Sequence, residues 1–163
     1  MPLQVFTIGG YGFTDSSFLS ALTKNEVDTL VDVRQRRGLR GSKYAFLNST
    51  RLQALVASAN IRYVHALGLA PTTAIRSTQK QEDQANAIRK RDRQLLSAEF
   101  IDKYSTCILD QFDDAAFLRS LESASALALF CVETEPSACH RSLAATRLAE
   151  LFNLDQPIRH LRP

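Results

Sequence analysis

The sequence lacks the features of membrane-spanning, secreted and disulfide-rich proteins. None of its apolar runs approaches the ~18 residues that a membrane-spanning helix requires. Its first residues, MPLQVF, have no basic region followed by an apolar core, so we expect no signal peptide. The three cysteines are an odd number, which argues against a disulfide framework and favours a reducing, cytoplasmic setting.

Internal repeats, low-complexity linkers and a strong excess of one charge are also absent. The 163 residues are 45% hydrophobic and 23% charged, which is ordinary for a soluble globular protein. A chain of this length is expected to form a single domain over 1–163. The net charge of +3 is mildly basic, which is compatible with a phosphate-bearing partner but does not require one.

Short apolar segments alternate with helical patterns along the chain. The predicted strands are 3–8, 27–33, 61–65, 126–132 and 157–161. The predicted helices begin at Thr14 or Asp15, Asn48 or Ser49, Ser97, Asp113 or Asp114, and about Cys139. This alternation predicts a three-layer, Rossmann-like α/β fold with a mostly parallel sheet and helices on both faces. A helical insertion between the third and fourth strands is predicted from about residue 79 to residue 123.

Residues 79–93, QKQEDQANAIRKRDR, are polar on nearly every face of a helix. This pattern predicts a solvated helix or a partly mobile segment. Its basic run, 89–93, is interpreted as a solvated face rather than as a contact with nucleic acid.

Polar and small residues follow the predicted strands. In open α/β sheets, ligands bind beyond the carboxyl ends of the strands, where the strand order reverses. A strand order of 3-2-1, with the fourth strand beside the first, places that crevice between the first and fourth strands. The residues at these strand ends are Gly9, Gly10, Tyr11, Asp32, Arg34, His65, Cys131 and Glu133.

The stretch 126–147 combines a buried strand, a polar turn and the start of a helix. Free backbone N–H groups and the positive end of the helix dipole predict an anion site at this start. Arg141, with Arg34 across the crevice, would add bidentate contacts to the anion. A thiol at a helix N-terminus has a lowered pKa, so Cys139 is a candidate thiolate and His140 its base or proton carrier.

Each cysteine also has a simpler interpretation. Cys131 is favoured as a packing residue, Cys139 is as consistent with packing as with chemistry, and Cys107 is assigned to the core or its margin. A zinc site of Cys131, Cys139 and His140, with Glu133 as a fourth group, is disfavoured because C-x7-C-H matches no standard zinc motif. A Cys131–Cys139 redox pair lacks the short C-x-x-C spacing. No metal site is predicted.

Two alternatives also stay open for the charged residues after the second strand. Asp32 either pairs only with Arg34 or takes an acid/base role. The loop 35–43, QRRGLRGSK, is either solvated or a phosphate-binding patch. The basic side chains of this loop are Arg36, Arg37, Arg40 and Lys43.

Several of these segments together resemble the DUF488 family, a mostly prokaryotic group of domains of unknown function. The matching segments are 7–9, 31–34, 61–65 with 67–68, 131–136 and 139–142. The resemblance implies a compact α/β domain with a polar site at the strand ends, and it implies no established reaction. It carries over Asp32, Arg34, Glu133, Cys139, His140 and Arg141.

Three functions are compatible with the sequence. The first is a cytoplasmic enzyme acting on an anionic, phosphate-bearing substrate such as a nucleotide or nucleic acid. Its catalytic candidates are Cys139, His140, Glu133 and Asp32, and its substrate-binding candidates are Gly9, Gly10, Tyr11, Arg34, His65 and Arg141. The second is a non-catalytic module that binds nucleic acid or a nucleotide, and the third is a Cys/His metal or redox site. The sequence identifies no cofactor, no oligomeric state and no membrane partner.

Overall fold

The computed structural model describes residues 2–163, which contain a five-stranded sheet whose strands are all parallel. The strands are β1 Gln4–Ile8, β2 Thr29–Asp32, β3 Arg62–His65, β4 Ala126–Phe130 and β5 Arg159–Leu161. The α-helices are α1 Asp15–Lys24, α2 Ser49–Ala57, α3 Thr73–Ala85, α4 Ala98–Tyr104, α5 Ala115–Leu121 and α6 His140–Leu151. The predicted α/β class is therefore confirmed.

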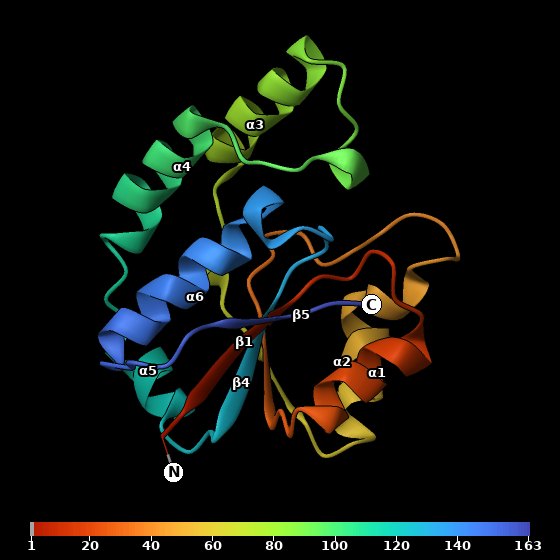
Figure 1. Cartoon of the computed structure of the whole chain (residues 1–163), viewed down its shortest axis with the longest axis vertical. Helices are drawn as coiled ribbons and strands as arrows, with labels where there is room; N and C mark the ends of the chain where they lie inside the picture. Colours follow the sequence, from red (N-terminus) through yellow and green to blue (C-terminus); the bar gives the residue numbers. More distant parts are fainter. Residues whose placement is uncertain (1) are drawn as a thin grey trace.

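The helices cover both faces of the sheet. Figure 1 shows α1 and α2 on one side of the strands and α5 and α6 on the other. Helices α3 and α4 pack against each other beyond the carboxyl ends of the strands. In the chain, α3, α4 and α5 lie between β3 and β4, and α3 begins before the predicted boundary at 79. Within residues 2–163, no helix is both long and apolar enough to span a membrane.

Three of the predicted helix starts follow the local capping rules. Thr14 caps α1 by accepting a hydrogen bond from Ser17 N, Ser97 caps α4, and Asp114 caps α5. These side chains satisfy N–H groups that have no partner inside the helix, so the chain turns into a helix at these points. All three starts agree with the sequence prediction.

The strand order, β3-β2-β4-β1-β5, corrects the predicted order 3-2-1 for the first three strands. β4 lies beside β1, as expected, but it also pairs with β2 and so separates β1 from β2. All five residues of β4 are buried, as expected for a central strand covered by helices on both faces of the sheet. The apolar run in the sequence indicated that this strand is buried, but not which strands lie beside it. Because β2 and β4 pair in parallel, their carboxyl ends are adjacent.

The polar segment 79–93 is less solvated than its composition predicts. Gln79, Asp83 and Arg93 are buried. Gln79 Nε2 donates a hydrogen bond to Asp83 Oδ1 at 2.8 Å, and Arg93 Nη1 donates to Asp83 Oδ2 at 2.8 Å. Polar side chains are tolerated in the interior when they bond to one another, and this pairing is invisible to a hydrophobicity pattern.

Candidate active site at the carboxyl ends of β2 and β4

A cavity of about 600 Å³ opens at the carboxyl ends of β2 and β4. Arg34, Cys131 and Glu133, which follow these strands, contribute to its lining together with His140 at the start of α6. Most of the remaining lining comes from the loop after β2, from α3 and from the segment between α3 and α4. The charged residues of the lining are the basic Arg34, Arg36, Arg76, Lys80, Lys90 and Arg93 and the acidic Asp83 and Glu133. This excess of basic residues favours an anionic ligand.

Asp32, the last residue of β2, holds the side chain of Arg34. Arg34 Nε and Nη2 donate hydrogen bonds to Asp32 Oδ1 and Oδ2 at 2.9 and 2.8 Å, and both residues are buried. The Arg34 guanidinium also lies 4.7 Å from the centre of the Phe130 ring. Its remaining nitrogen, Nη1, is buried without a hydrogen-bond partner anywhere in residues 2–163. The guanidinium is thus fixed in place with one donor left over for a ligand.

Two side chains of β3 support this pair. Tyr63 donates its hydroxyl to Asp32 Oδ2 at 2.6 Å. His65 Nε2 lies 2.8 Å from the carbonyl oxygen of Arg34, to which it donates. Neither residue lines the cavity. His65, a candidate for substrate binding, therefore holds the backbone of the β2 end.

Glu133 is buried beside two basic side chains. Its Oε1 accepts a hydrogen bond from Arg93 Nη2 at 3.1 Å and lies 3.4 Å from Lys90 Nζ, whereas Oε2 has no partner within the described chain. Burial alone would raise the pKa of Glu133, but Lys90 and Arg93 lower it below its ordinary value. Arg93 also donates to Asp83 and to the carbonyl oxygen of Ala138. One arginine thus connects α3, the turn after β4 and the start of α6.

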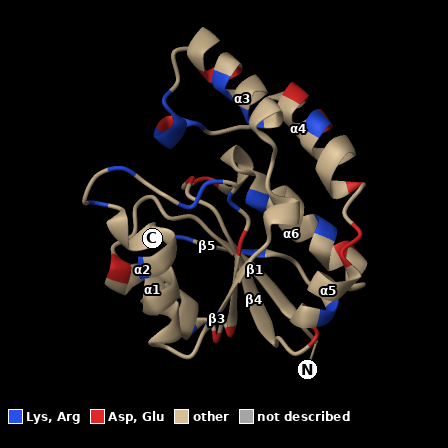
Figure 2. Cartoon of the chain, turned by 180° about the vertical axis from the view of Figure 1, so that it is seen from behind, with Lys and Arg blue, Asp and Glu red and all other residues tan. Residues whose placement is uncertain are grey.

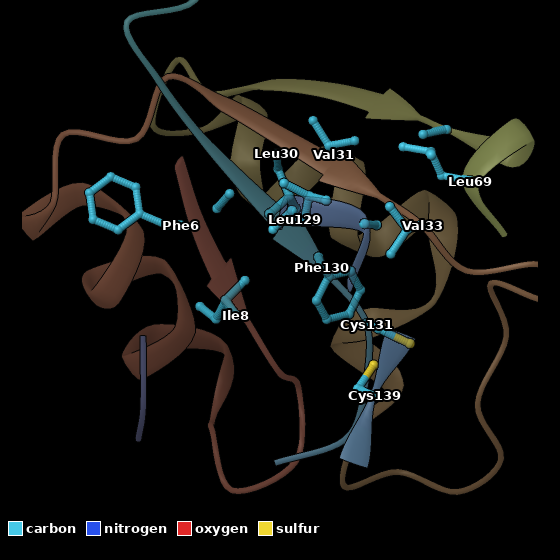
Figure 3. Close-up of a cluster of buried hydrophobic side chains, with 14 of the residues drawn as sticks. Phe6, Ile8, Leu30, Val31, Val33, Leu69, Leu129, Phe130, Cys131 and Cys139 are labelled. Carbon is cyan, nitrogen blue, oxygen red and sulfur yellow. The ribbon is translucent and has the colours of Figure 1, made fainter. Parts of the chain in front are cut away.

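Cys131, Cys139 and His140 form a buried group at the same end of the sheet. Their possible metal-ligand atoms all lie within 4.8 Å of one another. Figure 3 shows the two sulfur atoms close together at the edge of the core cluster, next to Phe130. His140 Nε2 lies 2.7 Å from the carbonyl oxygen of Val33, to which it must donate because a carbonyl only accepts. Nδ1, which is 4.0 Å from Cys139 Sγ, is therefore the nitrogen directed at the thiols.

The two thiols differ in acidity. The pKa of Cys131 is raised well above its ordinary value because its S–H donates to Cys139 and because it is buried. Burial also raises the pKa of Cys139, but the hydrogen bond from Cys131 and the nearby His140 outweigh burial and lower it. Burial by itself would lower the pKa of His140. The negative charge of Cys139 outweighs burial, so the pKa of His140 is raised above its ordinary value. The lowered pKa of Cys139 favours a thiolate at this position.

The candidates from the sequence are therefore only partly gathered around the cavity. Arg34, Glu133 and His140 line it, whereas Asp32 and Cys139 are fully buried behind them. Cys131, which was interpreted as a packing residue, is buried and also lines the cavity.

The other candidates shape the turn after β4. Arg141 is almost fully buried and donates to the carbonyl oxygens of Glu133 and Thr134, so its guanidinium is directed at the backbone and not into the cavity. The backbone N–H groups of Gly10 and Tyr11 both donate to the carbonyl oxygen of Val132. A Cβ on Gly9 would lie 2.0 Å from the carbonyl oxygen of Glu133. These residues, directly after β1 and in α6, hold the turn that carries Glu133.

The sequence interpretation missed several residues of the lining, and it placed three that form ion pairs in a solvated segment. They are Asp83, Lys90 and Arg93. The dense run of basic residues at 89–93 is the only signal in the sequence, and it does not separate the buried Arg93 from the exposed Arg89. Cys107, by contrast, was assigned to the core or its margin and is exposed.

A family model described as "Domain of unknown function DUF488" matches residues 15–148. This range includes every residue that lines the cavity, and the match confirms the resemblance indicated by the strand-end motifs. Comparisons with curated proteins and with solved structures found no match.

Proposed function

The chain belongs to the DUF488 family, whose function is unknown, and from the geometry of its site we propose that it is a small enzyme acting on a phosphate-bearing anion bound in the cavity. The observation that carries this proposal is the basic lining around Arg34, a buried guanidinium with one unused donor. Cys139, His140 and Glu133, in or directly behind that lining, are the reactive groups of the proposed enzyme.

The arrangement of the basic groups favours phosphate. Arg34 is held rigidly by Asp32, so little conformational entropy is lost when its free donor bonds to a ligand. Lys90 is only half buried, and Arg36 is exposed, so both remain free to move onto a second or third oxygen. A phosphate group presents three acceptor oxygens and up to two charges, which matches several convergent cations better than a single carboxylate does. A volume of about 600 Å³ accommodates a nucleotide.

The test is the binding of inorganic phosphate and of adenosine monophosphate, measured by isothermal titration calorimetry at low and at raised salt. Lys90→Ala removes one cation from the lining and leaves Glu133 paired with Arg93. We expect binding weaker by a factor of about 10 to 150, since a charge-assisted hydrogen bond contributes about 1.5–3 kcal/mol. The matched control is Lys24→Ala, which removes an exposed lysine at the end of α1. Absence of binding by the unmodified protein, or equal affinities for the two variants, would contradict the proposal.

The basic loop after β2 favours a second function, binding of nucleic acid. Arg36, Arg40 and Lys43 are exposed on this loop, which borders the cavity through Arg36. Figure 2 shows basic positions along this loop and along the segment between α3 and α4. In this case a single-stranded oligonucleotide binds with a steep dependence on salt, and Arg40→Ala weakens it without affecting phosphate. Fluorescence anisotropy measures this binding, and a flat salt dependence argues against it.

A further inference from the structure

We propose that Cys131, Cys139 and His140 bind a thiophilic divalent metal ion, Zn²⁺ above all, with a fourth coordination position directed toward the cavity. The inference stands on the buried group whose ligand atoms lie within 4.8 Å of one another. Metal binding itself does not depend on the proposed function. Only the role of the fourth coordination position, which faces the cavity where the substrate would bind, rests on it.

The donor set selects the class of metal. Two cysteine sulfurs and one imidazole nitrogen are soft or borderline ligands, which zinc prefers and which magnesium and calcium avoid. Tetrahedral zinc has bonds of roughly 2.0–2.3 Å, which sets neighbouring ligand atoms roughly 3.5–3.8 Å apart. Cys139 Sγ and His140 Nδ1 are 4.0 Å apart, so a shift of a few tenths of an ångström brings them to that spacing.

The imidazole of His140 already has the orientation of a metal ligand. Its Nε2 donates to the carbonyl oxygen of Val33 at 2.7 Å, which leaves the lone pair of Nδ1 directed at the sulfurs. A histidine that binds a metal through one nitrogen typically donates the other N–H to a backbone carbonyl or a carboxylate. Packing of two thiols in an apolar core would not require such a histidine.

The open side of this group is the cavity. Cys131 and His140 line it, and so does Glu133, which is two residues beyond Cys131. The Oε2 atom of Glu133 is buried and lacks a hydrogen-bond partner in the part of the chain that is described. An unpaired carboxylate oxygen in the interior is costly unless a ligand or ion satisfies it. Three protein ligands with an open fourth position are typical of catalytic zinc sites rather than structural ones.

The test is a titration of the full chain, stripped of metal and kept reduced in phosphate-free buffer, with Co²⁺ as a spectroscopic substitute for Zn²⁺. We expect sulfur-to-cobalt charge-transfer absorption in the near ultraviolet that saturates at one equivalent and disappears when Zn²⁺ is added. Cys131→Ser and Cys139→Ser each lose most of this absorption. The exposed third cysteine supplies the matched control, and Cys107→Ser keeps it in full.

A second measurement needs no variant. In urea that exposes the two buried cysteines of the metal-free protein, Zn²⁺ should protect both of them from a maleimide reagent, leaving Cys107 reactive. Absence of charge-transfer absorption, no protection by Zn²⁺, or a spectrum that survives Cys131→Ser overturns the metal site. These experiments contain no phosphate, so their failure leaves phosphate binding and its dependence on Lys90 unaffected. Conversely, loss of phosphate binding leaves the cobalt spectrum unaffected.

Discussion

The individual residues of the site are mostly buried polar groups whose hydrogen bonds come from neighbouring strands and turns. Asp32 binds Arg34 and accepts a hydrogen bond from Tyr63, and Glu133 accepts one from Arg93. Two atoms of this network, Arg34 Nη1 and Glu133 Oε2, have no partner within residues 2–163, and both residues line the cavity. A buried polar atom left unpaired costs about 1–3 kcal/mol, so the pair of unused atoms is better explained by a ligand than by packing.

Gly9, the first residue after β1, lies against the turn after β4. A Cβ at this position would lie 2.0 Å from the carbonyl oxygen of Glu133 and 3.2 Å from Arg141 Nη2. Since a backbone oxygen cannot move aside without shifting the turn, we expect Gly9→Ala to lower the free energy of unfolding by about 1–3 kcal/mol. Urea denaturation followed by circular dichroism measures this change.

Gly38→Ala is the control for this substitution. No atom lies within 4 Å of a Cβ built on Gly38, and its backbone needs no positive φ. We expect its free energy of unfolding to change by less than about 0.5 kcal/mol. If both substitutions lowered the free energy of unfolding equally, the close approach of Gly9 to the turn would not be the cause of the loss.

Among the secondary-structure elements, the segment between α3 and α4 is held to the sheet by Arg93. This side chain bonds to Asp83 of α3, to Glu133 after β4 and to the carbonyl oxygen of Ala138 before α6. The cavity wall formed by α3 and this segment thus depends on one buried cation.

Arg93→Met keeps the aliphatic length of the side chain and removes its charge. Asp83 then loses its basic partner and Glu133 keeps only Lys90, so we expect a loss of about 3–5 kcal/mol in the free energy of unfolding. The segment should also become sensitive to trypsin at Lys90 and Arg91, which limited proteolysis with mass spectrometry detects.

Arg89→Met tests whether any arginine of the same segment has this effect. Arg89 is 84% exposed and pairs only with Asp92 nearby. We therefore expect a change below about 0.5 kcal/mol and an unchanged pattern of cleavage at Lys90 and Arg91. Equal free energies of unfolding for the two variants would mean that the buried bonds of Arg93 do not stabilise the fold.

In the molecule as a whole, β4 is the central strand of the sheet. This strand is buried at every position and is paired with β1 on one side and β2 on the other, whereas β5 pairs only with β1. The lining residues Arg34, Cys131 and Glu133 come directly after β2 and β4.

Amide hydrogen exchange should reflect this difference. Amides of 126–130 are expected to exchange only through global unfolding, while those of the edge strand, 159–161, exchange through local opening that costs less free energy. Mass spectrometry of peptic fragments measures both rates in one experiment. Exchange of 126–130 as early as 159–161 would contradict the central place of β4 in the stability of the sheet.

The sequence by itself determined what depends on neighbouring residues. Caps such as Thr14, Ser97 and Asp114, the alternation of strands with helices, and the polar residues after each strand are encoded within a few positions, and the structure agrees with them. They were enough to predict the α/β fold, and a cavity opens at the carboxyl end of the sheet, where the candidate site was expected. The motifs after the strands also indicated the family.

Only the tertiary structure decided which distant residues meet. It inserted β4 between β1 and β2, joined Asp83 and Arg93 in the interior, and directed His140 toward the sulfurs of Cys131 and Cys139. Strand neighbours and buried ion pairs result from the free energy of the whole packed chain, so no local pattern specifies them. The same segments in the predicted order would have formed a different crevice with a different lining.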